Sequence, residues 1–206
     1  KPVTTYYIRA YATNALGTGY SETFTYETPL NVPDLDATTM TEVKPTTAKA
    51  ASVVISENGS EITEKGFCLS KTEKEPTIEN TKVVVNGSTA TYSVVLSNLE
   101  SATTYYIRSY ATNSKGTGYG EVAEFTTAVE IGETTVNGIT DTDASVSAEI
   151  LTPAEHLAIT EKGFCYSSVN AVPTVADTKK VSSTQGNSIT ASLTGLADHT
   201  KYYICA

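Results

Sequence analysis

Along much of the chain, hydrophobic residues recur at every second position, which is the period of a half-buried β-strand. Asn58-Gly59 and Asn86-Gly87 each lie between two apolar runs, and Asn-Gly is a strong signal for a tight turn between antiparallel strands. No segment shows a sustained helical period with helix caps. Within the middle of the chain, candidate strands lie near residues 34–41, 48–56, 62–70, 80–86, 90–97, 103–112 and 119–127.

The sequence also repeats itself over a long period. Residues 5–14 read TYYIRAYATN and residues 104–113 read TYYIRSYATN, and GTGY follows each run after two residues. The run ITEKGFC at 62–68 recurs at 159–165, and KYYI at 201–204 repeats TYYI. Phe24-Thr25 also corresponds to Phe125-Thr126 if the preceding loops differ slightly in length. The period of about 98 residues suits a self-contained domain better than a short solenoid repeat.

This period divides the chain into three parts. We expect residues 1–28 to be the C-terminal hairpin of a preceding repeat, 29–128 a complete module and 129–206 an incomplete module. An isolated two-stranded hairpin is marginal in water. The ends are therefore interpreted as those of a piece of a longer array. The alternative is that the hairpin of one copy completes the last module of another by strand donation.

About seven short strands in each period predict an antiparallel β-sandwich, and hence an all-β chain of tandem sandwich modules. One run is more specific, and reads Leu99-x5-Tyr105-x-Ile107-Arg108-x2-Ala111-x-Asn113-x2-Gly116-x-Gly118. It resembles the last two strands of a fibronectin type III module, in the immunoglobulin-like class of folds. The chain departs from animal type III domains in having no Trp, and it contains no Arg-Gly-Asp tripeptide.

A narrower resemblance comes from the GFC segment followed by a Pro-Thr pair, at Pro76-Thr77 and again at Pro173-Thr174. It is similar to divergent type III-like repeats in large surface proteins of Bacteroidetes. The resemblance implies an extracellular location on a bacterial cell surface. It also implies a structural or adhesion role, with neighbouring repeats of the same chain as partners.

Composition and charge argue against some classes of function. Hydrophobic residues make up 39% of the chain and charged residues 18%, which is typical of a globular protein. The net charge of −9 argues against nucleic acid and anionic membranes as partners, because both are negatively charged. No apolar run approaches the ~20 residues that span a bilayer.

The repeated YYIR strand supplies the candidate binding face. Strand alternation and the family resemblance predict that one set of residues points into the core, namely Tyr6, Ile8, Ala10 and Ala12, with Tyr105, Ile107, Ser109 and Ala111. The outward set is then Tyr7, Arg9 and Tyr11, with Tyr106, Arg108 and Tyr110. Its rings and guanidinium groups are suited to a glycan or protein ligand. The alternative, which recurrence in two repeats favours, is structural cross-strand packing of Arg on Tyr. Tyr105 is also a candidate for the buried corner tyrosine of such sandwiches.

Three cysteines occur in the chain. Cys68 and Cys165 occupy equivalent positions, and we expect buried thiols there. Cys205 replaces the outward Arg of the other repeats, so we expect an odd, exposed thiol there; the alternative is a Cys165–Cys205 disulfide if the two strands are neighbours. The cysteines lack CxxC spacing and histidine partners, so no metal site is predicted. Asp141-Thr142-Asp143 falls short of a calcium loop and is interpreted as a turn.

The sequence contains no recognisable catalytic motif or cofactor fingerprint. His156 and His199 lie in predicted loops without a paired Ser or Cys motif. We therefore expect a non-enzymatic chain without a cofactor. The leading interpretation is a structural spacer of a surface or fibrous protein, with self-association into a fibre open. The alternative is an adhesion or glycan-binding module.

Overall fold

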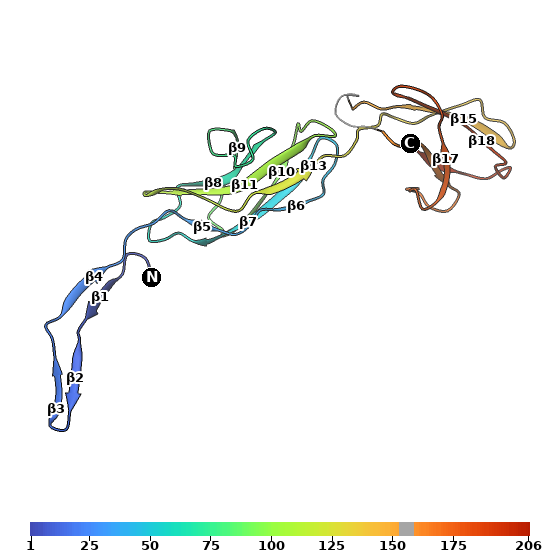
Figure 1. Cartoon of the computed structure of the whole chain (residues 1–206). Coiled ribbons are helices and arrows are strands. Elements are labelled where there is room, and N and C mark those ends of the chain that lie inside the picture. The colour runs from blue at the N-terminus through green and yellow to red at the C-terminus, as the bar shows by residue number, and fades with distance from the viewer. Residues whose placement is uncertain (153–158) are drawn as a thin grey trace. The chain divides into compact units, whose positions relative to one another are not determined.

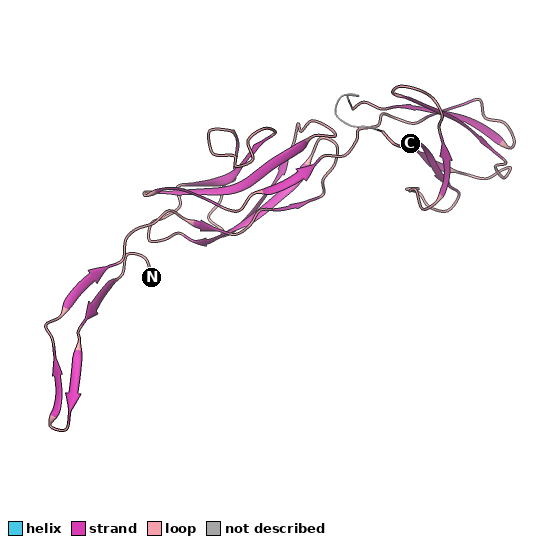
Figure 2. Ribbon diagram, viewed as in Figure 1, coloured by secondary structure: helices cyan, strands magenta, loops and turns pink. Residues whose placement is uncertain are grey.

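A computed structural model describes residues 1–152 and 159–206. Its regular elements in these ranges are all β-strands (Figures 1 and 2), which confirms the predicted all-β class. The chain forms two compact units. The first comprises residues 1–43, 48–96 and 104–125, and the second comprises residues 44–47, 97–103 and 126–206.

The sandwich of the first unit has two antiparallel sheets. One sheet has the order β10-β7-β5, with β6 also paired to β7. The other has the order β12-β11-β8-β9, with β13 also paired to β11. The strands of the first sheet are β5 (Asp34–Leu35), β6 (Thr39–Thr41), β7 (Ala48–Ser56) and β10 (Thr91–Leu96). Those of the second are β8 (Glu64–Ser70), β9 (Thr81–Val84), β11 (Thr104–Asn113), β12 (Gly116–Tyr119) and β13 (Ala123–Thr126).

Alternation along the strands builds the core of this sandwich. Buried and less buried residues alternate along β7, and Ala48, Ala50 and Val54 face inward. The predicted inward set of β11 is buried throughout: Tyr105, Ile107, Ser109 and Ala111. The rings of Tyr105 and Phe125 stack at 5.5 Å. The burial predicted for Tyr105 is confirmed.

The last strand differs from the sequence prediction. Residues 119–127 were expected to form one strand, but β12 ends at Tyr119 and β13 begins at Ala123. At Gly120, a Cβ atom would lie 2.6 Å from the Asp36 carbonyl oxygen and 2.3 Å from Ser109 Oγ. The backbone therefore approaches neighbouring groups so closely that only glycine fits. The strand breaks at this contact.

The first 28 residues form a long hairpin. Here β1 (Thr5–Ile8) pairs with β4 (Phe24–Glu27), and β2 (Tyr11–Asn14) pairs with β3 (Gly17–Tyr20). Within the described residues, these strands pair with no other strand. The predicted core positions Tyr6, Ile8, Ala10 and Ala12 are consequently exposed. That prediction was wrong because none of the described strands forms a second sheet over this face.

The second unit contains two further three-stranded antiparallel sheets. One has the order β14-β15-β18 and the other β17-β16-β19. The strands are β14 (Thr135–Asn137), β15 (Asp143–Glu149), β16 (Gly163–Ser167), β17 (Thr178–Val181), β18 (Ser188–Thr194) and β19 (Tyr203–Cys205). Their core consists of Val146, Ala148, Ile150, Phe164, Ile189 and Leu193. The turn predicted at residues 141–143 is confirmed, because the Thr140 N–H donates to the Asp143 carbonyl oxygen at 2.8 Å.

Candidate functional site

The predicted outward residues of β11 are only partly accessible. Tyr106 and Arg108 are half-buried, whereas Tyr110 is 0% exposed. The prediction of an outward, accessible Tyr110 was therefore wrong. Its Cα partner on β8 is Gly66, and a Cβ atom placed on Gly66 would lie 3.1 Å from the Tyr110 ring. The tyrosine is buried because its ring occupies the space that a larger residue at position 66 would take.

Tyr110 also belongs to a polar chain on the same face of the sheet. Its hydroxyl donates to Glu64 Oε1 at 2.9 Å, and the Lys82 ammonium group lies 3.0 Å from the same carboxylate oxygen. The Lys82 and Tyr110 hydrogen bonds lower the pKa of Glu64. Burial, and then the neighbouring Glu64 carboxylate, raise the pKa of Tyr110. These groups satisfy one another's hydrogen bonds, so they offer few donors or acceptors to a ligand.

Arg108 is held by the segment that follows β8. Its Nε donates to the Pro76 carbonyl oxygen and its Nη2 donates to the Glu75 carbonyl oxygen at 3.4 Å. Its guanidinium carbon lies 4.2 Å from the centre of the Tyr119 ring, and the Tyr119 hydroxyl accepts the Ile78 N–H at 3.2 Å. A cation–π contact of this kind contributes about 0.5–1 kcal/mol at exposed sites and more when desolvated. These contacts give Arg108 a packing role.

The hairpin carries the same Tyr-Arg-Tyr pattern, but its tyrosines are exposed to solvent. Arg9 lies 4.5 Å from the centre of the Tyr20 ring, and its Nε donates to the Ser21 carbonyl oxygen at 3.1 Å. Tyr7 and Tyr11 flank it with 75% and 74% of their surfaces exposed. Of the two predicted stripes, only this one presents its aromatic rings to solvent.

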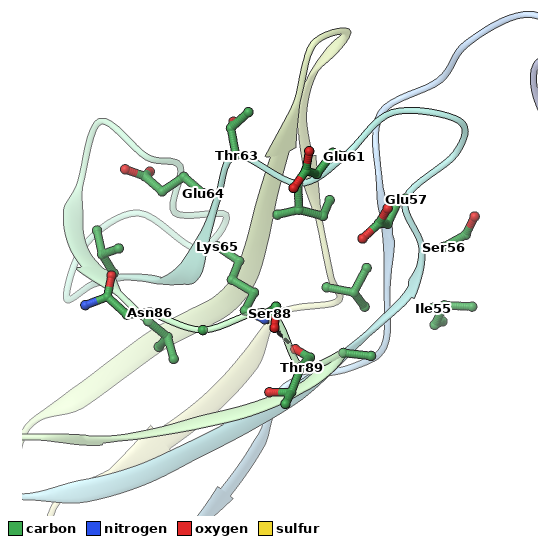
Figure 3. Close-up of a pocket in the computed structure, with 16 residues that line it drawn as sticks. Ile55, Ser56, Glu57, Glu61, Thr63, Glu64, Lys65, Asn86, Ser88 and Thr89 are labelled. Atoms are coloured by element: carbon green, nitrogen blue, oxygen red, sulfur yellow. Dashed lines mark hydrogen bonds between the residues drawn. The ribbon is translucent and has the colours of Figure 1, made fainter.

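A cavity of about 280 Å³ lies in the first unit, lined by polar and apolar residues of segments 54–57, 61–65 and 84–90 (Figure 3). Lys65 reaches across it and donates to the Thr89 carbonyl oxygen, while its ammonium group lies 5.3 Å from the centre of the Tyr92 ring. Lys65 is itself buried. This lysine therefore stabilises the sandwich. The sequence did not single it out, because its role depends on a contact with Tyr92 on β10.

The second unit has a more apolar cavity, of about 360 Å³. Its lining includes Val129, Ile131, Ile150 and Ile189, together with Cys165 and Cys205. The two cysteines are direct Cα partners on the neighbouring strands β16 and β19. The structure thus places side by side the two residues whose register the sequence left open, with both thiols free.

The three thiols differ in their surroundings. Cys68 is fully buried, its Sγ donates to the Pro76 carbonyl oxygen at 3.2 Å, and burial raises its pKa to about 11. Cys205 Sγ donates to the equivalent Pro173 carbonyl oxygen at 2.9 Å. Burial, followed by the nearby Asp177 charge, raises the pKa of Cys165. Burial, and then the charges of Cys165 and Asp177, raise that of Cys205. Cys165 and Cys205 are both half-buried, so the prediction of a buried thiol is confirmed for Cys68 and was wrong for Cys165.

His199 is not placed in a catalytic arrangement. His199 is exposed and lies 3.6 Å from its sequence neighbour Asp198, and His156 lies outside the described residues. Across residues 1–152 and 159–206, no group of three or more His, Cys, Asp or Glu residues is arranged to hold a metal ion. The same part of the chain contains no helix long and apolar enough to cross a membrane.

Comparison with known proteins gives weak likenesses only. No protein-family model and no curated protein matches the sequence. Among solved structures, the chain is similar to domains d3 and d4 of the rat CD45 extracellular region. That alignment has 18% identity and a TM-score of 0.39, and covers 62% of this chain and 65% of that chain.

Two further solved structures are similar to the chain with comparable identity and TM-score. The FN1 to FN3 domains of chicken CNTN1 align with 21% identity and a TM-score of 0.38, over 98% of this chain and 69% of that chain. A multidomain segment of titin aligns with 22% identity and a TM-score of 0.37, over 57% of this chain and 39% of that chain. Likeness at this level assigns no function, and the fold class rests on the strand order and register above. The chain is all-β, with antiparallel sheets arranged as in the fibronectin type III and immunoglobulin-like class of β-sandwich.

Proposed function

We propose that the chain is a non-catalytic structural spacer made of tandem type III-like repeats in an extracellular protein of a bacterial surface or fibre. The observation that carries this proposal is the internal use of the repeated Tyr-Arg-Tyr face. Arg108 bonds to the Pro76 carbonyl oxygen and packs on Tyr119, and Tyr110 is buried against Gly66. A face whose side chains stabilise their own module is expected in a spacer.

Two features of the sequence support the surface location and the tandem arrangement. The repeated blocks recur at a spacing of about 97 to 99 residues, as tandem modules require. The GFC and Pro-Thr signature is similar to repeats of Bacteroidetes surface proteins. Neighbouring repeats are then the partners of each module, and their association with further copies would build a fibre.

A ligand screen tests the spacer proposal. The full chain would be immobilised and exposed to a panel of bacterial and host polysaccharides and matrix proteins, with surface plasmon resonance as the readout. A spacer should show no saturable binding. Saturable binding that is lost in an Arg108→Gln variant, shown by circular dichroism to remain folded, would overturn the proposal, because the repeated face would then be a binding site.

One observation favours a second candidate, adhesion to a glycan. Tyr7 and Tyr11 expose most of their rings on either side of Arg9, and such rings can stack on sugar faces. If this candidate holds, Tyr7→Ala and Tyr11→Ala should each abolish binding in the same screen. Tyr106→Ala is the matched control, because Tyr106 is the half-buried counterpart of Tyr7 on β11.

A further inference from the structure

The second unit replaces an arginine by a second cysteine at one cross-strand position. In the first unit Cys68 lies opposite Arg108, and in the second unit the equivalent Cys165 lies opposite Cys205. Directly opposite residues of an antiparallel pair point to the same face of the sheet. The two thiols of β16 and β19 therefore share one face, whereas Cys68 has a guanidinium-bearing neighbour there.

The backbone spacing at this position suits a disulfide. Directly opposite Cα atoms in antiparallel strands lie about 4.5–5.5 Å apart. Disulfides join residues whose Cα atoms are about 4.4–6.8 Å apart. The register of Cys165 and Cys205 thus places their Cα atoms in the range that a disulfide spans, so that rotation of the two side chains can bring the sulfur atoms together. Cys205 would give up its hydrogen bond to the Pro173 carbonyl oxygen in that rotation.

The same two thiols are also within reach of a small reagent. Both are half-buried, and both line the cavity of about 360 Å³ in the second unit. Cys68 is buried among the strands and the segment around Pro76. Accessibility and pairing therefore separate Cys165 and Cys205 from the third cysteine of the chain.

We propose that Cys165 and Cys205 form a redox-sensitive pair, in which an external small-molecule disulfide such as oxidised glutathione converts the two thiols into a cross-strand disulfide. One protein thiolate attacks the reagent's S–S bond, forms a mixed disulfide and releases one glutathione thiolate. The other protein thiolate then attacks the protein sulfur of the mixed disulfide and releases the second glutathione. The protein loses two electrons and two protons, and the reagent leaves as two glutathione thiols.

The consequence is a covalent tie between strands β16 and β19. A bond between Cys205 and Cys165 would hold β19 against β16 when the ladder hydrogen bonds between the two strands open. Oxidising surroundings would thus fix this strand pair, and reducing ones would release it.

Thiol counting in the full chain tests the proposal. The folded protein would be incubated with oxidised glutathione at about pH 9, above the ordinary thiol pKa of about 8.5 because the pKa values of Cys165 and Cys205 are raised, then denatured, alkylated and mapped by mass spectrometry. We expect the number of alkylated thiols to fall from three to one, with Cys68 as the remaining thiol and a cross-linked peptide joining Cys165 to Cys205. Three alkylated thiols, a persistent mixed disulfide, or a disulfide between two chains would each overturn the proposal.

Matched variants separate pairing from general oxidation. Cys68→Ser should lose both of its remaining thiols to an intramolecular disulfide on oxidation, whereas Cys205→Arg should form no disulfide within the chain and at most a mixed disulfide with glutathione at Cys165. The arginine restores the residue found at this position in the other repeats, so the variant is expected to fold. Retention of both thiols in Cys68→Ser would contradict the assignment to Cys165 and Cys205. The peptide map of the unmodified sequence gives the answer even if a variant fails to fold.

Discussion

Two regions of the molecule share nearly the same sequence and differ in their environment. The hairpin strands β1 and β2 carry TYYIRAYATN, and β11 carries TYYIRSYATN. Both turns have an Asn side chain that accepts a backbone N–H two residues on, from Leu16 to Asn14 Oδ1 and from Lys115 to Asn113 Oδ1, each at 2.8 Å. The Thr pairs next to these turns match as well, at 2.8 Å in the hairpin and 2.9 Å in the sandwich. Local chemistry thus specifies the turn and the pairing.

Burial, in contrast, depends on the opposing sheet. Ile107 is 0% exposed, whereas its counterpart Ile8 is 52% exposed. Strand β11 is continuous and pairs with β8 through Arg108 and Ser109, but the hairpin is interrupted at the equivalent residues 9 and 10. The lesson is that the same ten residues encode a strand pair locally and acquire a core only through contact with residues far along the chain.

The largest expected effect on stability comes from the isoleucine that the two regions share. Ile107→Ala should destabilise the first unit by about 2–5 kcal/mol, because it removes buried methyl groups and leaves a cavity. Ile8→Ala, the matched change in the hairpin, should alter stability by less than about 0.5 kcal/mol. Urea unfolding with hydrogen–deuterium exchange of peptides from β7 and β8 would measure both. Equal losses in the two variants would show that the hairpin is buried in solution.

The next effect concerns the turn asparagine. Asn113 is buried, and its Nδ2 donates to the Asn31 and Glu57 carbonyl oxygens at 2.8 and 2.9 Å. Asn113→Ala leaves these acceptors without their donor and should cost about 2–3 kcal/mol in the free energy of unfolding. Asn14→Ala loses only the local bond from Leu16 and should cost well under about 1 kcal/mol. Comparable losses in the same unfolding assay would contradict the tertiary role of Asn113.

Much of the fold could be predicted from local patterns. The period of two placed the strands and the inward residues of β11, since one buried face requires that alternation. The turn predicted at Asn58-Gly59 also forms, because both residues have positive φ, 53° and 97°, although the strands that it joins, β7 and β8, lie in different sheets. These features depend on neighbours in sequence, so the sequence alone is sufficient to find them.

The remaining features depend on contacts between distant residues. Burial of Tyr110 requires Gly66 on another strand, and pairing of Cys165 with Cys205 requires the register of β16 and β19. The repeat alignment also changes. Thr28 Oγ1 accepts the Thr4 N–H and Thr127 Oγ1 accepts the Thr103 N–H, each at 2.9 Å. The two hairpins therefore correspond without a length difference, and the predicted match of Phe24-Thr25 with Phe125-Thr126 was wrong.

A smaller effect on stability is expected at the arginine that the two regions share. Arg108→Gln removes the donors to the Pro76 and Glu75 carbonyl oxygens and the contact with Tyr119, so we expect a loss of about 1–2 kcal/mol. Arg9→Gln should leave the unfolding midpoint unchanged, because its contacts with Tyr20 and Ser21 lie in solvent. A thermal shift assay with both variants measures the difference. An unchanged midpoint for Arg108→Gln would remove the packing explanation for the repeated arginine.

The smallest expected effect is a dependence of stability on pH, which the hairpin should lack. Tyr110 donates to Glu64, whereas its counterpart Tyr11 lies in the hairpin and is exposed. Because the folded pKa of Glu64 is lowered, its contribution to stability is present above the unfolded pKa and disappears as pH falls through the folded value. The carboxylate is more than one third exposed, so solvent screening limits this contribution to about 0.5 kcal/mol or less. Urea midpoints measured at falling pH should converge for the native chain and Glu64→Gln, and added salt should reduce their separation near neutral pH. A separation that grows as pH falls would show that Glu64 stabilises the fold in its protonated form.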